Sequence, residues 1–185
     1  MDTLPDYLSG KLYFLSVGLN PSTVSVEAGY YFANPRNRFW QALNQSRLVD
    51  VKLEPGTAAM QTLQDRYHIG FTDLVKRPTR MASALRVTDY RQGAPELKRK
   101  IMDTRPDIAW FHGMVAYRNY MKYAEDIELD QIAWGPQKHN IGRSRVFLTP
   151  NPSPANARYS IPDLVRSYND MVGFRIRELI GLGFN

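Results

Sequence analysis

The sequence predicts an α/β protein, a three-layer α/β/α sandwich with a mostly parallel sheet of about four strands. Short apolar runs with strand character alternate with longer stretches of helical periodicity, the order expected when helices join parallel strands. Two of the runs, residues 12–17 and 145–149, are followed closely by the same tripeptide, Asn-Pro-Ser. With 185 residues and 43% hydrophobic content, the chain is expected to form one domain over residues 1–185 with its own core.

The N-terminal part of the chain is expected to hold one strand and one helix. After a short lead-in, residues 1–10, the apolar run 12–17 forms the first strand. Residues 23–37 mix aromatic residues with Gly and Pro and predict a long loop, and a loop of this length inside a compact domain is usually functional. Asn37 then caps a helix over residues 38–48, whose apolar face is assigned to the core rather than to a cofactor site.

The middle of the chain adds a second strand between two helices. The first of these helices is expected over residues 57–66, and residues 68–75 then form a short apolar strand. This run contains Asp73, which is either a turn residue that binds local backbone or a carboxylate held at a strand end for chemistry. The next helix is predicted over residues 94–104 and is introduced by Pro95.

The C-terminal half continues the alternation of strands and helices. A third strand is predicted over residues 107–111, and a helix follows over residues 114–123. A mixed connector, residues 124–144, contains a Trp-Gly-Pro turn and leads into the strand 145–149. A final amphipathic helix spans residues 162–179.

The two Asn-Pro-Ser turns indicate where a ligand would bind. Proline restricts the residue before it to extended backbone, so Asn20 and Asn151 are held at defined places just past their strands. If the two strands are parallel neighbours, their carboxyl ends lie together, where open α/β sheets place ligands. The alternative is that each tripeptide is ordinary turn chemistry.

The charge of the chain favours a polyanionic partner. It carries 24 Lys and Arg against 18 Asp and Glu, a net charge of +6, and its pI is near 9.6. The basic residues collect in segments near the predicted crevice: Arg36, Arg38, Lys76, Arg77, Arg80, Lys138, Arg143, Arg145 and Arg158.

Composition also argues against several classes of site. The chain has no cysteine, which excludes disulfides and thiolate metal sites, and His68, His112 and His139 lack the spacing of zinc ligands. His112 is interpreted as a residue that supports the site or as structural, rather than as catalytic. No apolar run approaches the length of a membrane span and the N-terminus does not resemble a signal peptide, so a soluble intracellular protein is expected.

Four segments in order resemble one family of DNA repair enzymes. They read VGLNPS, YYFANPRNRFW, GFTDLVKRPT and NPSPANAR, and together with their surroundings they cover roughly residues 12–175. Each segment alone is a weak signal, whereas their order and spacing are specific. The chain thereby resembles the mismatch-specific uracil-DNA glycosylase and thymine-DNA glycosylase family, within the uracil-DNA glycosylase superfamily.

The resemblance assigns a catalytic role to Asn20, and Asp73, a departure from the family pattern, is a second candidate. The family's first motif usually reads Gly-Ile-Asn-Pro-Gly, and its Asn positions the water that attacks the sugar C1′, a role that falls here to Asn20. A carboxamide cannot take up a proton as a carboxylate can, so Asn20 alone implies a modest catalyst. Asp73 stands where other branches carry a lysine or an asparagine. If its carboxylate reaches the crevice, it could orient or deprotonate the water and extend activity beyond easily extruded mismatched bases.

The resemblance also implies the residues that bind the flipped base. Backbone around Gly18 and Leu19 would meet the base, and Phe32 matches the aromatic residue on which the base stacks. The second motif contains Asn151 and Ser153 and matches the segment on the pyrimidine side. Asn151 would donate to the carbonyl oxygen that gains charge as the base leaves, in the manner of an oxyanion hole.

The loop after the second motif enters the duplex in family members. Here it contains no large apolar wedge, which is closer to the thymine-DNA glycosylase style, and Arg158 is the candidate plug, with phosphate contact as the alternative. Ser22 replaces the usual glycine after Asn-Pro and could narrow the pocket floor or contact a phosphate. The expected DNA-binding residues are Ser22, Pro154, Ala155, Asn156, Ala157 and Arg158.

The expected function is therefore that of a monofunctional uracil-DNA glycosylase in base excision repair. It would flip uracil out of G·U mismatches and other contexts and hydrolyse the N-glycosidic bond with water, with no metal or organic cofactor. Its partner would be DNA, as a duplex or single strand, and it would act as a cytoplasmic, nucleoid-associated monomer in a bacterium. Thymine is a less expected substrate, because the aromatic residues before Ala33 could exclude its methyl group.

Two other classes remain open from the sequence. One is a module of the same fold that binds uracil-containing or damaged DNA without cleaving it, against which the presence of Asn20 and Asp73 argues. The other is a small nucleotide or nucleoside hydrolase. The Arg158 loop and the basic segments favour a polymer over a free nucleoside.

Overall fold

The computed structural model describes residues 2–182 and contains one sheet of five strands. Four strands are parallel, and the fifth, a short strand at one edge, is antiparallel. In spatial order the strands are β2 (Ile69–Asp73), β1 (Phe14–Gly18), β3 (Ile108–His112), β5 (Arg145–Thr149) and β4 (Gly135–Pro136). The predicted α/β fold with a mostly parallel sheet is confirmed, and the predicted Trp-Gly-Pro turn supplies the additional edge strand.

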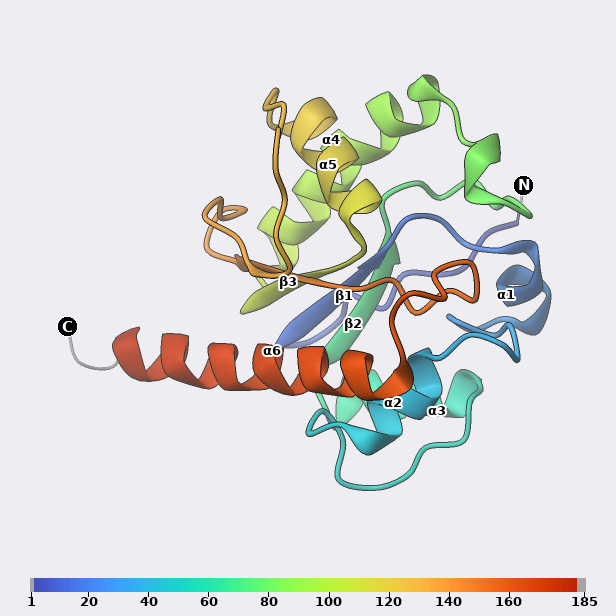
Figure 1. Cartoon of the computed structure of the whole chain (residues 1–185), viewed down its shortest axis with the longest axis vertical. Helices are drawn as coiled ribbons and strands as arrows, with labels where there is room; N and C mark the ends of the chain where they lie inside the picture. The colour runs from blue at the N-terminus through green and yellow to red at the C-terminus, as the bar shows by residue number, and fades with distance from the viewer. Residues whose placement is uncertain (1, 183–185) are drawn as a thin grey trace.

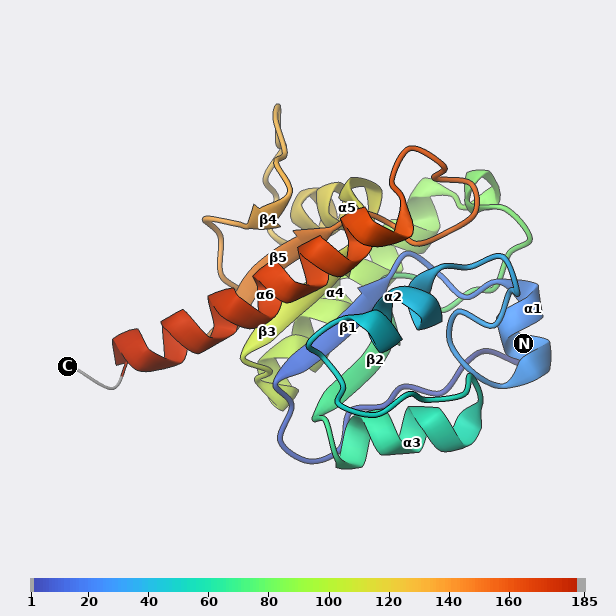
Figure 2. The same cartoon turned by 60° about the horizontal axis from the view of Figure 1, so that its bottom comes forward.

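Helices cover both faces of the sheet (Figures 1 and 2). The helices of residues 2–182 are α1 (Thr23–Ala28), α2 (Phe39–Gln45), α3 (Thr57–Asp65), α4 (Val87–Thr104), α5 (Met114–Ala124) and α6 (Ile161–Leu182), with a 3₁₀ turn, η1 (Ala82–Ala84). One face of the sheet carries α2, α3 and α6, and the other carries α4 and α5, which lie side by side. Within residues 2–182, no helix combines the length and apolar character needed to cross a membrane.

The three-layer arrangement creates two cores, one on each face of the sheet. Successive side chains of a strand point to opposite faces, so Phe14 and Trp110 pack under α2 and α6 while Leu15 and Phe111 pack under α4 and α5. Because both faces are covered, the central strands are apolar along most of their length rather than alternating. This is why the sequence shows them as continuous apolar runs.

The chain order of the strands places a switch point between β1 and β3. From β1 the chain moves outward to β2 and then returns past β1 to β3, so the connections leave β1 and β3 in opposite directions. Open α/β sheets bind ligands at the carboxyl ends of strands at such a point. The two Asn-Pro-Ser turns are not on neighbouring strands, because β3 lies between β1 and β5.

The long loop predicted over residues 23–37 is partly helical, which corrects that prediction. Ser22 lies in extended backbone and its Oγ accepts a hydrogen bond from Ser25 N at 3.1 Å, so it caps the start of α1. Gly29, at φ 79°, adopts the left-handed conformation that ends the helix. The six-residue helix α1 is therefore defined by its caps, and it is too short for hydrophobic periodicity to reveal.

The helix predicted over residues 94–104 begins earlier, at Val87, so Pro95 lies inside α4 rather than at its start. The start is defined by Arg86, whose backbone N–H donates to the Asp89 carboxylate at 2.7 Å. Asp89 in turn accepts from Arg77 at 2.6 Å, a contact from a distant segment that sequence pattern does not reveal.

Candidate active site

A cleft of about 700 Å³ opens at the carboxyl ends of β1, β2 and β3. It contains the sequence motifs predicted to form the site. A second hollow, of about 470 Å³, lies between α6 and the β4 edge and contains none of the predicted site residues. The cleft is therefore the candidate active site.

Most of the predicted site residues line this cleft. The members are Gly18, Leu19, Asn20, Ser22, Phe32, Asp73, Asn151, Ser153, Pro154 and Ala155. The remaining loop residues, Asn156, Ala157 and Arg158, do not line it, and Ala157 and Arg158 are exposed on the loop beyond. The fold thus brings the two motifs, separated by about 130 residues of chain, to one cavity.

The side chain of Asn20 is held through the nitrogen of its carboxamide. Its Nδ2 donates to Arg77 O at 3.0 Å, to Thr79 Oγ1 at 2.8 Å and to Pro21 O at 3.3 Å. These bonds join the first motif to the loop after β2, so the amide group is fixed without help from a ligand. With Nδ2 committed to this loop, Oδ1 is the atom of the carboxamide that can accept a hydrogen bond from a water.

Asp73 ends β2 directly beside Gly18, with which it pairs in the sheet register. The side chain is 4% exposed, and within residues 2–182 its Oδ2 has no hydrogen-bond partner. Burial raises the pKa of Asp73 to about 7. A carboxyl group with this pKa is part ionised at neutral pH, which suits an acid-base role.

Gly18 permits the approach of Asp73. A Cβ on Gly18 would lie 2.4 Å from Asp73 Oδ1, closer than any side chain tolerates. The carbonyl oxygens of Gly18 and Leu19 accept hydrogen bonds from Leu74 N and Val75 N, both at 2.9 Å. The first motif and the end of β2 are thereby locked together, with Asn20 following one strand and Asp73 ending its neighbour.

His112 ends β3 and lines the cleft between the two motifs. Its Nε2 lies 2.8 Å from Ser16 Oγ, and within the described chain its Nδ1 is buried without a partner. Burial lowers its pKa to about 3, so the ring is neutral at neutral pH. The sequence interpretation left open whether His112 supports the site or is structural, and the strand order shows that β3 and His112 lie between the two motifs.

Phe32 belongs to an aromatic wall of the cleft. It has a left-handed backbone, φ 58°, and its ring stacks on Phe39 with centroids 4.1 Å apart. Phe39 is the fully buried first residue of α2, so the half-buried loop aromatic is supported by the core. A positive φ is unusual for an aromatic residue and marks a position at which the surroundings determine the backbone.

Asn151 is positioned by its own loop. Its Oδ1 accepts from Ser153 N at 2.9 Å, and its backbone oxygen accepts from Asn156 Nδ2 at 3.0 Å. On its other side Asn151 lies against Gly113, where an added Cβ would be 3.3 Å from the Asn151 Cβ. Because Oδ1 is engaged, the amide nitrogen of Asn151 is the group that can donate to a ligand.

Arg38 holds the second motif from the inside. Its guanidinium donates to Ser153 O at 3.0 Å and Asn156 O at 2.6 Å, and also to Pro152 O and Tyr159 O. Arg38 therefore supports the 152–159 loop and cannot serve as a surface cation, although the sequence places it in a basic segment. Arg77 is likewise paired, with Asp89 at 2.6 Å.

The mouth of the cleft carries exposed cations and one exposed apolar side chain. Arg36 and Arg80 line it from two sides, and Met81 beside them is 70% exposed. Ser22 lies at the mouth, but its hydroxyl caps α1 and also lies 3.1 Å from Ser25 Oγ. Across residues 2–182, no three His, Cys, Asp or Glu side chains gather in an arrangement that could hold a metal ion.

Two comparisons with known proteins bear on the fold and the family of the chain. Residues 5–172 match the Uracil DNA glycosylase superfamily. Among solved structures, the chain is similar to the solution NMR structure of a candidate uracil DNA glycosylase from Methanosarcina acetivorans, with 19% identity and a TM-score of 0.54 over 92% of this chain and 97% of that one. At this identity the likeness shows the fold. Neither comparison separates the branches of the superfamily, so the resemblance to the mismatch-specific and thymine-DNA glycosylase branch stays a prediction. The match over most of its length shows that the chain belongs to the uracil DNA glycosylase superfamily.

Proposed function

We propose that the protein is a monofunctional uracil-DNA glycosylase that uses an activated water to release uracil from G·U mismatches and other contexts in DNA. One observation carries the proposal: a carboxamide, Asn20, and a buried carboxyl group, Asp73, stand at the ends of adjacent strands in one cleft. Membership of the superfamily supports a DNA glycosylase function in general. The substrate preference and the residue roles are part of the proposal.

In the proposed reaction, Asn20 and Asp73 share the attacking water. The Asn20 Oδ1 accepts one hydrogen of the water, and the Asp73 carboxylate takes up its proton as the oxygen bonds to C1′. The C1′–N1 bond breaks and its electron pair leaves with the base as an anion. The ionised carboxyl group also stabilises the positive charge that develops on the sugar.

The flipped base would stack on Phe32, because that ring lines the cleft and is backed by Phe39. The Asn151 amide would donate to the carbonyl oxygen that gains negative charge as the bond breaks. Ser153 would support this group, because its backbone N–H already bonds Asn151 Oδ1. Backbone of Gly18 and Leu19 would form the floor of the pocket.

The 154–158 loop would enter the duplex and fill the space that the base leaves. Arg158 is its exposed cation and our candidate plug, with phosphate contact as the alternative. Arg36 and Arg80 would contact the DNA backbone at the mouth of the cleft. Ser22 would also lie against the DNA there, although its hydroxyl caps α1. We further propose that the protein acts on DNA as a monomer inside the cell.

Single-turnover cleavage of labelled DNA tests the proposal. Duplexes with G·U, A·U and G·T pairs and single-stranded uracil would be incubated with the wild type, Asn20→Ala and Asp73→Ala. The wild type should cut G·U, and each variant should lose at least about a hundredfold in rate. Asn119→Ala, which removes a carboxamide on α5 outside the cleft, is the matched control and should cut at the wild-type rate.

Two results would point to another class of protein. Tight binding of these DNAs without cleavage by the wild type would identify a binding module of the same fold. A free-nucleoside hydrolase would act on nucleosides with little dependence on salt, whereas binding to DNA weakens steeply as salt rises.

A further inference from the structure

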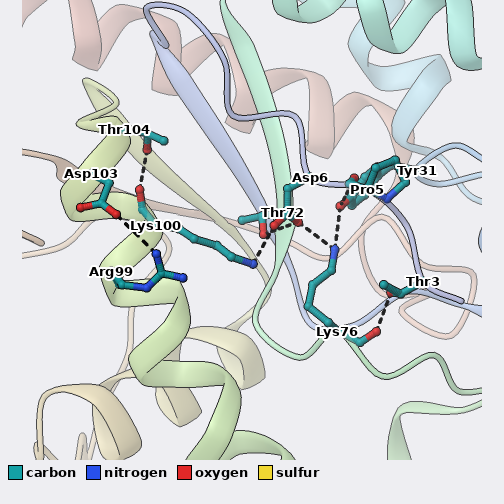
Figure 3. Close-up of polar contacts among 10 residues, drawn as sticks. All are labelled: Thr3, Pro5, Asp6, Tyr31, Thr72, Lys76, Arg99, Lys100, Asp103 and Thr104. Carbon is teal, nitrogen blue, oxygen red and sulfur yellow. Dashed lines mark hydrogen bonds and ion pairs between the residues drawn. The ribbon is translucent and has the colours of Figure 1, made fainter. Parts of the chain in front are cut away.

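A compact cluster of charges lies beside Thr72 of β2 (Figure 3). The Oδ1 atom of Asp6 accepts from Lys76 Nζ and from Thr72 Oγ1, both at 2.8 Å. The other oxygen, Oδ2, lies 2.7 Å from Lys100 Nζ. The three charged side chains are only 15% to 24% exposed, so two shielded cations share one anion. The cluster is therefore net positive.

This cluster is attached to the wall of the cleft at two points. Thr72, which binds Asp6, immediately precedes Asp73 in β2. Lys76 Nζ also lies 3.3 Å from the hydroxyl of Tyr31, a residue that lines the cleft. The Tyr31 hydroxyl donates onward to Pro5 O at 3.1 Å, which ties the N-terminal segment to the same wall.

The titratable groups around Asp73 come from five parts of the chain. Asp6 is in the N-terminal segment, Lys76 follows β2, Lys100 is on α4, and Tyr31 and His112 line the cleft. Burial raises the pKa of Tyr31 and lowers that of His112 to about 3, so both are uncharged at neutral pH. The charged groups among these five are therefore the members of the cluster, and the cations that line the cleft, Arg36 and Arg80, are exposed.

The members of the cluster shift the pKa of Asp73 in opposite directions. Burial is the main influence and raises the pKa of Asp73 to about 7; Lys76 and Lys100 lower it, and Asp6 raises it. The pKa of Asp6 itself is lowered by its two lysine partners, despite the opposing effect of burial, so Asp6 stays ionised and holds both lysines in place.

We propose that Lys76 and Lys100, anchored by Asp6, are positioning residues that keep the Asp73 carboxylate charged inside the cleft. The cluster does not touch substrate and acts through Asp73, so this inference rests on the proposed role of Asp73 as the base. It explains how a buried carboxyl group can be available as a base near neutral pH. The cations of the cluster offset part of the cost of burial, and within residues 2–182 the Asp73 Oδ2 atom keeps no hydrogen-bond partner.

The test is to titrate the Asp73 carboxyl carbon by NMR in the full chain, with Asp73→Asn used to assign the resonance. In Lys76→Met, which removes a cation, the midpoint should rise by roughly half a unit to one unit. In Asp6→Asn the negative charge is removed, but the carboxamide oxygen can still accept the hydrogen bond from Lys76 and keep that cation in place, so the midpoint should fall. A cluster that served only to stabilise the fold would not shift the midpoint in opposite directions.

Lys98→Met is the matched control. Lys98 is on α4 close to Lys100 in sequence, and it makes an ion pair outside the cluster, with Glu125 at 2.8 Å. Its removal should leave the midpoint unchanged. If Lys76→Met does not fold, Lys100→Met carries the same prediction of a rise, and Lys76→Arg should keep the wild-type midpoint.

In each variant, the acid limb of the pH profile of the single-turnover rate should shift by the same amount as the titration midpoint of Asp73. Unchanged midpoints in both variants, or shifts in the same direction, would overturn the inference. Failure of this inference can be distinguished from failure of the proposed function. Full cleavage by Asp73→Asn would show that Asp73 is not the base. The titration of Asp73 tests the effect of the cluster whether or not DNA is cut.

Discussion

At the scale of single residues, Asp73 combines a cost to stability with the proposed chemistry in one group. The side chain is 4% exposed, its Oδ2 is unpartnered within residues 2–182, and its pKa is raised from 3.8 to about 7. A carboxyl group whose pKa is raised on folding destabilises the folded state once it ionises. Function and stability therefore make opposite demands on this position.

The first prediction concerns the stability of Asp73→Asn. Below pH 3.8 the wild-type group is protonated in both states, and between 3.8 and about 7 the unfolded chain loses its proton first. The wild type thus becomes less stable as pH rises through this window, while the neutral carboxamide of the variant would carry no such cost. Urea unfolding at pH 8 should show the variant more stable by about 2 to 4 kcal/mol. At pH 5 less than half of this gain should remain, and a gain that does not change with pH would contradict the raised pKa.

The second prediction concerns the pH dependence of cleavage. If the ionised Asp73 is the base, the single-turnover rate should follow an acid limb with a midpoint near 7. Between pH 8 and pH 6 the rate should fall about tenfold, because the ionised fraction falls by that factor. His112, with a pKa of about 3, should not contribute to the limb. A profile that stays flat from pH 5 to pH 8 would exclude Asp73 as the base.

At the scale of elements, the candidate site depends on segments that are locked to one another. The turn after β1 is bonded to the loop after β2 through Asn20, and the turn after β5 is bonded to the start of α2 through Arg38. Each Asn-Pro-Ser turn is thus fixed by a part of the chain far away in sequence. Such rigidity favours catalysis by positioning, on which a carboxamide depends.

The third prediction compares two arginines that are two residues apart. Arg38→Met removes the donor for four carbonyl oxygens of the 152–159 loop. Hydrogen bonds to charged groups contribute about 1.5 to 3 kcal/mol, so the variant should lose stability of that order and bind DNA poorly. Arg36→Met, in contrast, removes an exposed cation at the mouth of the cleft and should weaken DNA binding with no change in stability. Thermal unfolding and DNA binding measured side by side distinguish the two, and equal stabilities would contradict the role of Arg38.

At the scale of the whole molecule, net charge is a poor guide to which cations are free to meet DNA. The charge of +6 includes arginines and lysines that are committed inside the protein, among them Arg38, Arg77, Lys76 and Lys100. The exposed cations of the basic segments are fewer, namely Arg36, Arg80, Lys138, Arg143 and Arg158, and of these Arg36 and Arg80 line the cleft. The surface that would face DNA is consequently smaller than the basic segments of the sequence imply.

The fourth prediction concerns the salt dependence of DNA binding. Each phosphate contact that is lost reduces the slope of log affinity against log salt concentration by roughly one. Arg80→Ala should show this reduced slope for every DNA sequence, since Arg80 is proposed to contact only the backbone. Arg158→Ala should instead lose affinity mainly for DNA with an extruded base, if it fills the duplex, and fluorescence anisotropy at several salt concentrations checks both. An unchanged slope for Arg80→Ala would remove it from the interface.

The sequence by itself determined the strands, most of the helices and the motif residues that line the cleft. Apolar runs and Asn-Pro-Ser turns are local signals, and they located β1, β2, β3 and β5 to within about two residues. Only the tertiary structure decided what surrounds these motif residues, because those surroundings depend on contacts between segments that are distant in sequence. The position of β3 between the two motifs brings His112 into the cleft. The Arg38 guanidinium donates to backbone oxygens of the second motif and so supports it. The cluster behind Asp73 joins Asp6 to residues that lie 70 and 94 positions further along the chain, a meeting that only the packed fold creates.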